Sequence, residues 1–147
     1  MSQFSFESSP GGDAVTKYMT RYRHSDVPPF EVAAPLDLFP SQTVPAGFTP
    51  QLTWEHPWPF GDRAGVYFVY SASFDLLYVG TAQYLGARLS QHFIRNGEKE
   101  CVIREKWSQQ PRFVINIAVP TDMAFEAAAL EGFLIGELQP PDNVKGK

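Results

Sequence analysis

Two short apolar runs, separated by turn-forming residues, stand near the middle of the chain. Residues 65–70 (GVYFVY) are apolar, β-branched or aromatic, residues 71–75 carry turn-type side chains, and residues 76–80 (LLYVG) form the second run. Two such runs on either side of a turn are typical of a β-hairpin. The sequence therefore predicts a hairpin over residues 65–80.

A helical pattern follows the hairpin. Good helix formers dominate residues 83–93, where apolar side chains recur at four-residue spacing and make one apolar stripe. Arg88 and His92 are also four residues apart, so they share a helix face beside that stripe. The pattern predicts a helix that presents this pair together, either as part of a site or as an ordinary solvated face.

Later segments complete a mixed pattern of strands and helices. Residues 112–119 are apolar and β-branched, which predicts a third strand. Thr121 and Asp122 suit the start of a helix that runs to about Leu138, where two prolines stop it. Residues 101–107 are compatible with a short helix. The predicted fold class is α/β of the α+β type, with a small three-stranded, mostly antiparallel sheet flanked by helices.

Residues 1–60 form a proline-rich N-terminal extension with no sustained period of 3.6 or 2. Asp13 is expected to cap a short helix that ends near Met19 or Arg23. Most of the thirteen prolines lie in this extension, and proline fixes φ and removes an amide donor, so an extended wrap is expected rather than sheet strands. We therefore divide the chain into the extension, 1–60, and a main domain, 61–147.

The extension carries too many apolar side chains for a solvated linker. Phe30, Leu36, Phe39 and Phe48 are expected to pack along the outside of the main domain, and a contact with substrate or partner is the alternative. The aromatic residues of segment 54–63 are open to the same two interpretations, because exposed rings stack on bases and covered rings simply pack.

Three glutamates distinguish the faces of the last predicted helix. Glu126 and Glu137 are eleven residues apart, which at ~100° per residue gives them nearly the same direction and predicts a solvent face. Glu131 points about 140° away from Glu126, among apolar side chains. An ionised carboxylate there is unfavourable unless a cation pairs with it, so the residues alone leave open either a buried arginine or a metal ion.

The hairpin and the following helix carry a recognisable set of residues. The tripeptide GVY at 65–67 is followed after ten residues by YVG at 78–80, then by Arg88, ten residues after the second tyrosine, and by His92 four residues later. Either tripeptide alone would carry no meaning. Their conjunction in this order and spacing resembles the GIY-YIG nuclease family, with valine in place of isoleucine in each tripeptide.

The resemblance extends to the end of the chain. Glu131 on a later helix and Asn143 after a proline-containing stretch match the family pattern, so the similarity covers about residues 64–143. It implies a metal-dependent endonuclease that hydrolyses phosphodiester bonds of DNA. It also makes Glu131 the expected ligand of one divalent ion, Mg²⁺ or Mn²⁺, because Mg²⁺ often needs only one or two carboxylates beside water and substrate oxygens.

The resemblance also assigns expected roles to the other motif residues. Arg88 would hold the scissile phosphate through its fork of donors. Tyr67 would face the attacking water as base or as positioning group, and Tyr78 would line the same site. The ordinary phenol pKa of about 10 means that Tyr67 needs help to act as a base. His92 would orient water or accept the proton, because imidazole titrates near neutral pH.

Three further residues are expected on the substrate side of the site: Gly80, Thr81 and Asn143. Many family members carry a lysine directly after the second glycine, where this chain has Thr81. A proton route through that lysine is therefore closed here, and His92 gains weight as the proton acceptor.

Charge and composition modify this interpretation. The net charge is −4, which disfavours extensive phosphate contacts, although segment 81–112 carries a local excess of basic residues. A catalytically silent module that binds nucleic acid or protein on the same scaffold is therefore the alternative function. The sequence has one cysteine, Cys101, no apolar run of transmembrane length and no signal-like start, so we expect a cytoplasmic protein without a membrane segment.

Overall fold

The computed structural model describes residues 4–45, 48–95 and 101–144. These residues form six strands and four helices, with five of the strands in succession after the first helix. In order they are α1 (Pro10–Tyr22), β1 (Glu31–Val32), β2 (Leu36–Asp37), β3 (Leu52–Thr53), β4 (Gly65–Ser71), β5 (Leu76–Ala82), α2 (Leu85–His92), β6 (Pro111–Ala118), α3 (Glu126–Leu138) and α4 (Pro141–Val144).

The predicted hairpin forms the centre of the sheet. β4 and β5 pair antiparallel, with Tyr67 opposite Gly80, and β6 pairs antiparallel with the other side of β4, with Tyr67 opposite Asn116. The hairpin and the third strand are therefore confirmed, and α2 begins two residues later than predicted. These three long strands place the two motif tripeptides side by side.

The sheet has more strands than the three predicted. It is six-stranded, in the order β3-β2-β6-β4-β5, with β1 also paired to β6. The extra strands come from the N-terminal extension, and β2 and β3 pair parallel to each other. Prolines flank these short strands rather than interrupt them, so the residues between the prolines keep amides that can donate to the sheet. Ala33 and Leu38 each donate to a β6 carbonyl at 2.9 Å. The expectation of an extended wrap without strands was wrong for this reason.

The helix at the start of the extension is also longer than expected. α1 begins at Pro10, a favourable first helical residue, and its cap is Ser9, whose Oγ accepts from the Gly12 amide at 3.3 Å. Asp13 was predicted to be the cap, but it lies in the first turn, where its charge suits the helix dipole.

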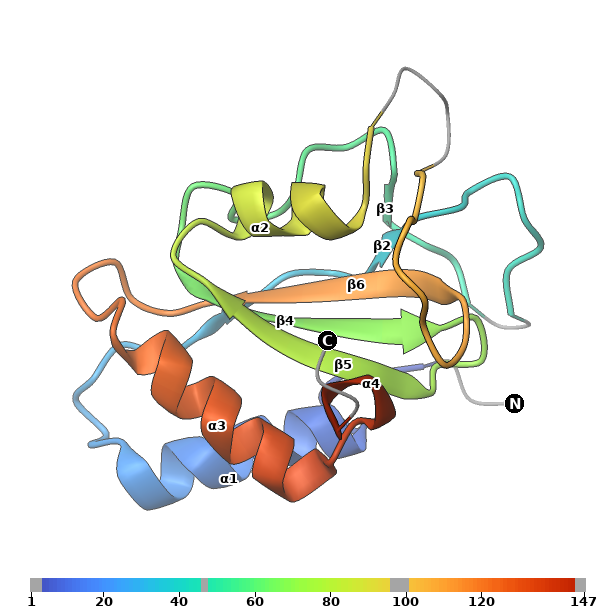
Figure 1. Ribbon diagram of the computed structural model, residues 1–147. Helices are drawn as coiled ribbons and strands as arrows, with labels where there is room; N and C mark the ends of the chain where they lie inside the picture. The colour runs from blue at the N-terminus through green and yellow to red at the C-terminus, as the bar shows by residue number, and fades with distance from the viewer. Residues whose placement is uncertain (1–3, 46–47, 96–100, 145–147) are drawn as a thin grey trace.

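The two faces of the sheet are covered by different helices. Figure 1 shows α1 and α3 lying side by side on one face and α2 on the opposite face. Val66, Phe68 and Tyr70 of β4 belong to the core on the α1 and α3 side, whereas Tyr67 and Val69 belong to the core on the α2 side. Since side chains alternate along a strand, the tyrosine of the first motif tripeptide necessarily points toward α2.

The extension contributes to both cores. Phe30 and Phe48 are buried on the α1 and α3 side, and Leu36 and Phe39 are buried on the α2 side. These four side chains are therefore packed rather than exposed.

A buried ion pair holds the extension to the main sheet. Arg112 on β6 donates from Nε and one terminal nitrogen to the two carboxylate oxygens of Asp37 on β2, at 2.6 and 3.0 Å. The same guanidinium donates to the carbonyls of Gln42 and Thr43. The side chains of Arg112 and Asp37 are only 3% and 1% exposed. The pairing therefore leaves neither buried charge without a partner.

Two other helix predictions were wrong. α3 begins at Glu126 rather than near Thr121, because the intervening residues form turns. Residues 101–107 form no helix, and Val102 instead makes an isolated antiparallel bridge to Ile94. None of the helices in the described ranges is long and apolar enough to cross a membrane.

Of the two glutamates predicted to mark a solvent face of α3, Glu137 is exposed and Glu126 is not. Glu126 is buried, accepts two bonds from the Arg23 guanidinium at 2.6 and 3.1 Å and one from the Tyr18 hydroxyl at 3.4 Å. Glu137 pairs with Lys17, also on α1. The two carboxylates therefore share a direction as predicted, but that direction is toward α1, which lies alongside α3.

Candidate active site

Two tyrosines from the hairpin lie next to each other beneath α2. The ring centroids of Tyr67 on β4 and Tyr78 on β5 are 6.0 Å apart. Gly80, directly opposite Tyr67 in the register, leaves the space that the Tyr67 ring fills: a Cβ on Gly80 would lie 2.3 Å from Tyr67 Cζ and 2.4 Å from its hydroxyl oxygen. Gly80, expected to contact substrate, thus forms the slot for the tyrosine ring.

A chain of hydrogen bonds leads away from Tyr67. Its hydroxyl lies 2.9 Å from Nε2 of His92, on the last turn of α2, and Nδ1 of His92 lies 2.8 Å from Oε1 of Glu105. Tyr67 and His92 are buried, and the Glu105 side chain is 40% exposed. The chain therefore links a buried phenol to a carboxylate at the surface.

The surroundings of both phenols favour their neutral form. Burial raises the pKa of Tyr67 well above its ordinary value of 10.0, and proximity to Tyr78 raises it further. Burial likewise raises the pKa of Tyr78. The positive charge of Arg88 lowers both values in part, so this guanidinium stabilises whatever negative charge develops on either oxygen.

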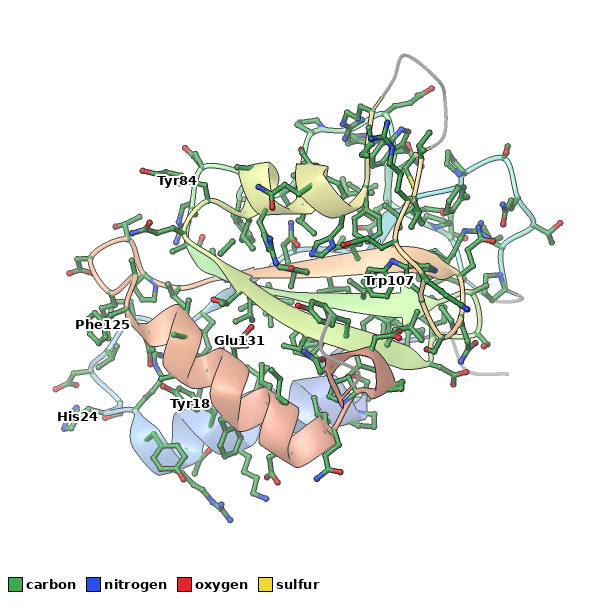
Figure 2. The ribbon with its side chains drawn as sticks, in the orientation of Figure 1. Tyr18, His24, Tyr84, Trp107, Phe125 and Glu131 are labelled. Carbon is green, nitrogen blue, oxygen red and sulfur yellow. The ribbon has the colours of Figure 1, made fainter. Side chains whose placement is uncertain are left out.

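Arg88 and Glu131 complete the cluster from two different helices. Arg88 on α2 acts electrostatically on both tyrosines and on Glu131, and it donates to Gln91 Oε1 at 2.8 Å. Figure 2 shows Glu131 on the side of α3 turned toward the sheet. Burial raises the pKa of Glu131, and the Arg88 charge opposes this shift. The structure thus brings together Tyr67, Tyr78, Arg88, His92 and Glu131.

The members of the cluster differ in their access to solvent. Tyr67 is 0% exposed and Tyr78 is 5% exposed, whereas Arg88 and Glu131 are half-buried. Tyr67 was expected to face the attacking water, but here it lies one layer below the surface, because β4 is covered on both faces. Water reaches its hydroxyl only after a covering side chain has moved.

Glu131 has the properties of a ligand for one divalent cation. Among the described residues it makes no direct hydrogen bond or ion pair, and the charge that opposes the rise of its pKa is that of Arg88. A half-buried carboxylate with free oxygens suits Mg²⁺, which keeps several of its waters. The described ranges hold no group of three or more acidic, histidine or cysteine side chains placed to bind a metal, so the site would rest on this single carboxylate together with substrate oxygens.

The remaining motif residues support the hairpin. Gly65 is required by packing, since a Cβ there would collide with the Ile117 carbonyl of β6. The Thr81 hydroxyl donates to the Gly65 carbonyl at 3.2 Å. The Asn143 amide accepts from the Val79 amide at 2.8 Å and donates to the Val79 carbonyl at 2.9 Å. Thr81 and Asn143 were expected to face substrate, and in this structure their described bonds hold the backbone of the hairpin.

The local cationic segment, 81–112, offers less free charge than its composition suggests. Arg112 is not available to bind phosphate, because it forms a buried ion pair with Asp37. Arg95 packs over the Trp54 ring, with Cζ 4.1 Å from the centroid. Its guanidinium also donates to the backbone carbonyls of Trp54 and His56. Trp54 itself is buried, so the rings of this loop serve packing rather than base stacking.

Two residues of the site had no signal in the sequence. Glu105 and Trp107 lie in the loop before β6, where no hydrophobic period exists. The Trp107 ring lies 5.7 Å from Tyr78 and 5.9 Å from His92, and Figure 2 shows it beside the hairpin. Only the tertiary structure brings this loop to the motif.

A comparison with known sequences matches the segment of the chain that carries these residues. The family model for the UvrC-like GIY-YIG domain matches residues 63–144, more than half of the chain. No curated protein matches the chain. The matched segment contains the hairpin, α2 and α3, which supply Tyr67, Tyr78, Arg88, His92 and Glu131.

Proposed function

Because the chain belongs to the family of UvrC-like GIY-YIG domains, we propose that it is a metal-dependent endonuclease that hydrolyses phosphodiester bonds of DNA. The observation that carries the proposal is the convergence of five reactive side chains from β4, β5, α2 and α3 on one cluster. The family's nuclease fold supports the general activity, and this cluster supports the specific chemistry.

Arg88 is the residue that binds the scissile phosphate in this proposal. It is half-buried, always charged, and carries several donors in a fixed plane. A phosphate that pairs with Arg88 lies near Tyr67 and Tyr78, because the guanidinium acts on both phenols. Arg88 then stabilises the charge that develops on the phosphoryl oxygens, and a covering side chain must move before the attacking water reaches Tyr67.

Tyr67 and His92 move the proton. As the water oxygen bonds to phosphorus, the water proton passes to the Tyr67 oxygen, the Tyr67 proton passes to His92 Nε2, and the bond from phosphorus to the leaving oxygen breaks. The 2.9 Å contact allows the second transfer. Thr81 stands where a lysine would offer another route, so the histidine is the available acceptor.

Glu131 would hold one Mg²⁺ or Mn²⁺ ion. Such an ion supplies Lewis-acid stabilisation of charge on the phosphoryl and leaving oxygens. Gln139 ends the helix in a left-handed conformation, and α4 then brings Asn143 to β5, so the C-terminal turn fixes α3, and with it Glu131, against the hairpin.

The test uses purified protein with plasmid, single-stranded and branched DNA, with and without Mg²⁺. Wild type should cleave at least one substrate in Mg²⁺ only. Glu131→Gln should abolish cleavage and leave the free energy of unfolding equal or higher, since a partly buried charge without a direct partner is removed. Glu137→Gln, on the same helix but paired with Lys17, is the matched control and should cleave normally.

Cleavage by Glu131→Gln at the wild-type rate would exclude Glu131 as the ligand. DNA binding without cleavage by wild type, under every metal condition, would instead identify a silent binding module.

A further inference from the structure

The carboxylate of Glu105 makes the outermost contact of the hydrogen-bond chain from Tyr67. It approaches His92 Nδ1 at 2.8 Å, while the opposite ring nitrogen faces the Tyr67 hydroxyl at 2.9 Å. The His92 side chain is 4% exposed. Both nitrogens of a buried imidazole are therefore committed to partners, and the identity of each partner determines where the proton sits.

An ionised carboxylate can only accept a hydrogen bond. Glu105 therefore requires the proton of a neutral His92 to be on Nδ1, because a lone pair on Nδ1 would face the carboxylate oxygen without any proton between them. Nε2 is then left as an acceptor, and the Tyr67 hydroxyl must donate to it. The chain runs in one direction, from Tyr67 through His92 to Glu105.

This direction matters because Tyr67 cannot lose its proton to solvent. It is 0% exposed, and burial raises the pKa of its phenol. In the opposite tautomer, Nε2 would donate to the phenol oxygen and offer it no place to send a proton. The carboxylate also stabilises the imidazolium that forms when His92 accepts the proton, as the aspartate does in a Ser-His-Asp triad.

We propose that Glu105 is a positioning residue that holds His92 with its proton on Nδ1, so that Nε2 is always ready to accept the proton of Tyr67. The catalytic role of Glu105 rests on the proposed nuclease function. Its effect on the tautomer of His92 does not depend on that function, so the two claims can fail separately.

The rest of the same loop supports this role. Trp107, two residues after Glu105, packs edge-on against the His92 ring with centroids 5.9 Å apart, and Tyr78 packs edge-on from the hairpin at the same distance. The ring is therefore confined on several sides, which hinders a ring flip that would place carbon atoms where the two nitrogens now meet Glu105 and Tyr67. One loop both orients the imidazole and encloses it.

The first test is the tautomer of His92 in protein without DNA or metal, read from ¹⁵N and ¹H NMR of histidine side chains. The chain has only three histidines, and the signals of His92 are those that vanish in His92→Asn. Wild type should show the Nδ1–H form. Glu105→Ala should convert a substantial fraction to the Nε2–H form, which free imidazole side chains favour. Finding Nε2–H in wild type, or an unchanged tautomer in Glu105→Ala, would overturn the proposal.

The second test is kinetic. Glu105→Ala and Glu105→Gln should lower kcat by about 10- to 100-fold, the range typical of removing a partner that orients a histidine, with KM for DNA unchanged. Glu105→Asp should recover part of the loss. Glu31→Gln is the control, because Glu31 makes a similarly exposed ion pair, 2.7 Å from Arg63, and it should cleave like wild type.

The melting temperature should fall by only a few degrees in any of the Glu105 variants, because each removes or alters a single hydrogen bond between the buried His92 ring and a carboxylate that is 40% exposed. Wild-type kcat in Glu105→Ala, or a loss confined to KM, would contradict the positioning role. If wild type cleaves no DNA, the nuclease proposal fails, and the NMR measurement still decides whether Glu105 sets the tautomer.

Discussion

Gly80→Ala is the substitution that most directly tests how the second motif tripeptide works. Only one methyl group is added, at a position where the backbone is an ordinary strand residue opposite Tyr67. That methyl would lie 2.3 Å from Tyr67 Cζ, 2.4 Å from the hydroxyl oxygen and 2.8 Å from Cε1. The whole polar end of the ring must therefore move.

The required movement is about 1 Å, since ordinary carbon contacts begin near 3.4 Å. Tyr67 is fully buried, so its ring can move only by displacing its neighbours, and overpacking of this kind costs about 1 to 3 kcal/mol. A displacement of about 1 Å at a catalytic group lowers turnover by about 10²-fold. The contact with His92, 2.9 Å in the native arrangement, is the first to be lost.

The assay compares DNA cleavage and thermal melting of Gly80→Ala with those of Gly136→Ala. Gly136 is an exposed residue of α3 where an added Cβ meets no atom within 4 Å, and alanine there should stabilise the helix by about 0.5 to 1 kcal/mol. The same chemical change should thus destabilise at one site and stabilise at the other. A Gly80→Ala protein that melts and cleaves like wild type would refute the claim that Gly80 is needed to make room for the Tyr67 ring.

Substitutions at three further residues test the phosphate contact, the ion pair that holds the extension and one buried phenol. Arg88→Ala should lower turnover by about 10² or more, and Arg88→Lys should restore only part of it, since lysine offers a point charge instead of a fork; full activity of the lysine variant would contradict this. Asp37→Ala should lower the free energy of unfolding by about 3 to 5 kcal/mol in chemical denaturation, because Arg112 is left buried and unpaired; a loss below about 1 kcal/mol would show that water compensates the guanidinium. Burial raises the pKa of Tyr70 above 10.0 in the folded protein, so the contribution of this phenol to stability is complete below that pH and is lost as pH rises beyond it. Tyr70→Phe should therefore reduce the fall in melting temperature between about pH 9 and pH 11. Equal falls in the wild type and the variant would exclude a contribution of Tyr70 to the pH dependence.

The local parts of the fold could be predicted because short-range sequence patterns determine them. The hairpin and β6 follow from apolar, β-branched runs bounded by turn residues, and the shared face of Arg88 and His92 follows from their four-residue spacing. The short strands of the extension follow from no such pattern, since each has only two residues. β1 and β2 form because β6 offers carbonyl and amide groups beside them, and β3 then pairs with β2. The partners of β1 and β2 on β6 lie 76 to 87 positions away, from Asp37 to Phe113 and from Glu31 to Ala118.

The glutamates of α3 show the limit of helical periodicity in another way. Periodicity gives the angle between Glu126 and Glu137 correctly, but it does not say what lies in that direction. Here α1 lies there, with Arg23 and Lys17 as partners. Glu131 was assigned to an apolar face and is half-buried beside Arg88, because α3 packs on both α1 and the sheet. The pattern around Glu105 was compatible with a short helix that does not form and gave no sign of a site, so only the path of its loop places this residue.

The position of β6 has a consequence for any attempt to isolate the matched segment. One side of this eight-residue, fully buried strand pairs with β4, and the other side pairs with β1 and β2 from the extension. A fragment that begins after residue 60 would leave that second side as an open row of backbone donors and acceptors on an apolar strand. Such an edge is a template for pairing with another chain and promotes aggregation. The extension therefore protects the sheet from intermolecular association in addition to filling its cores.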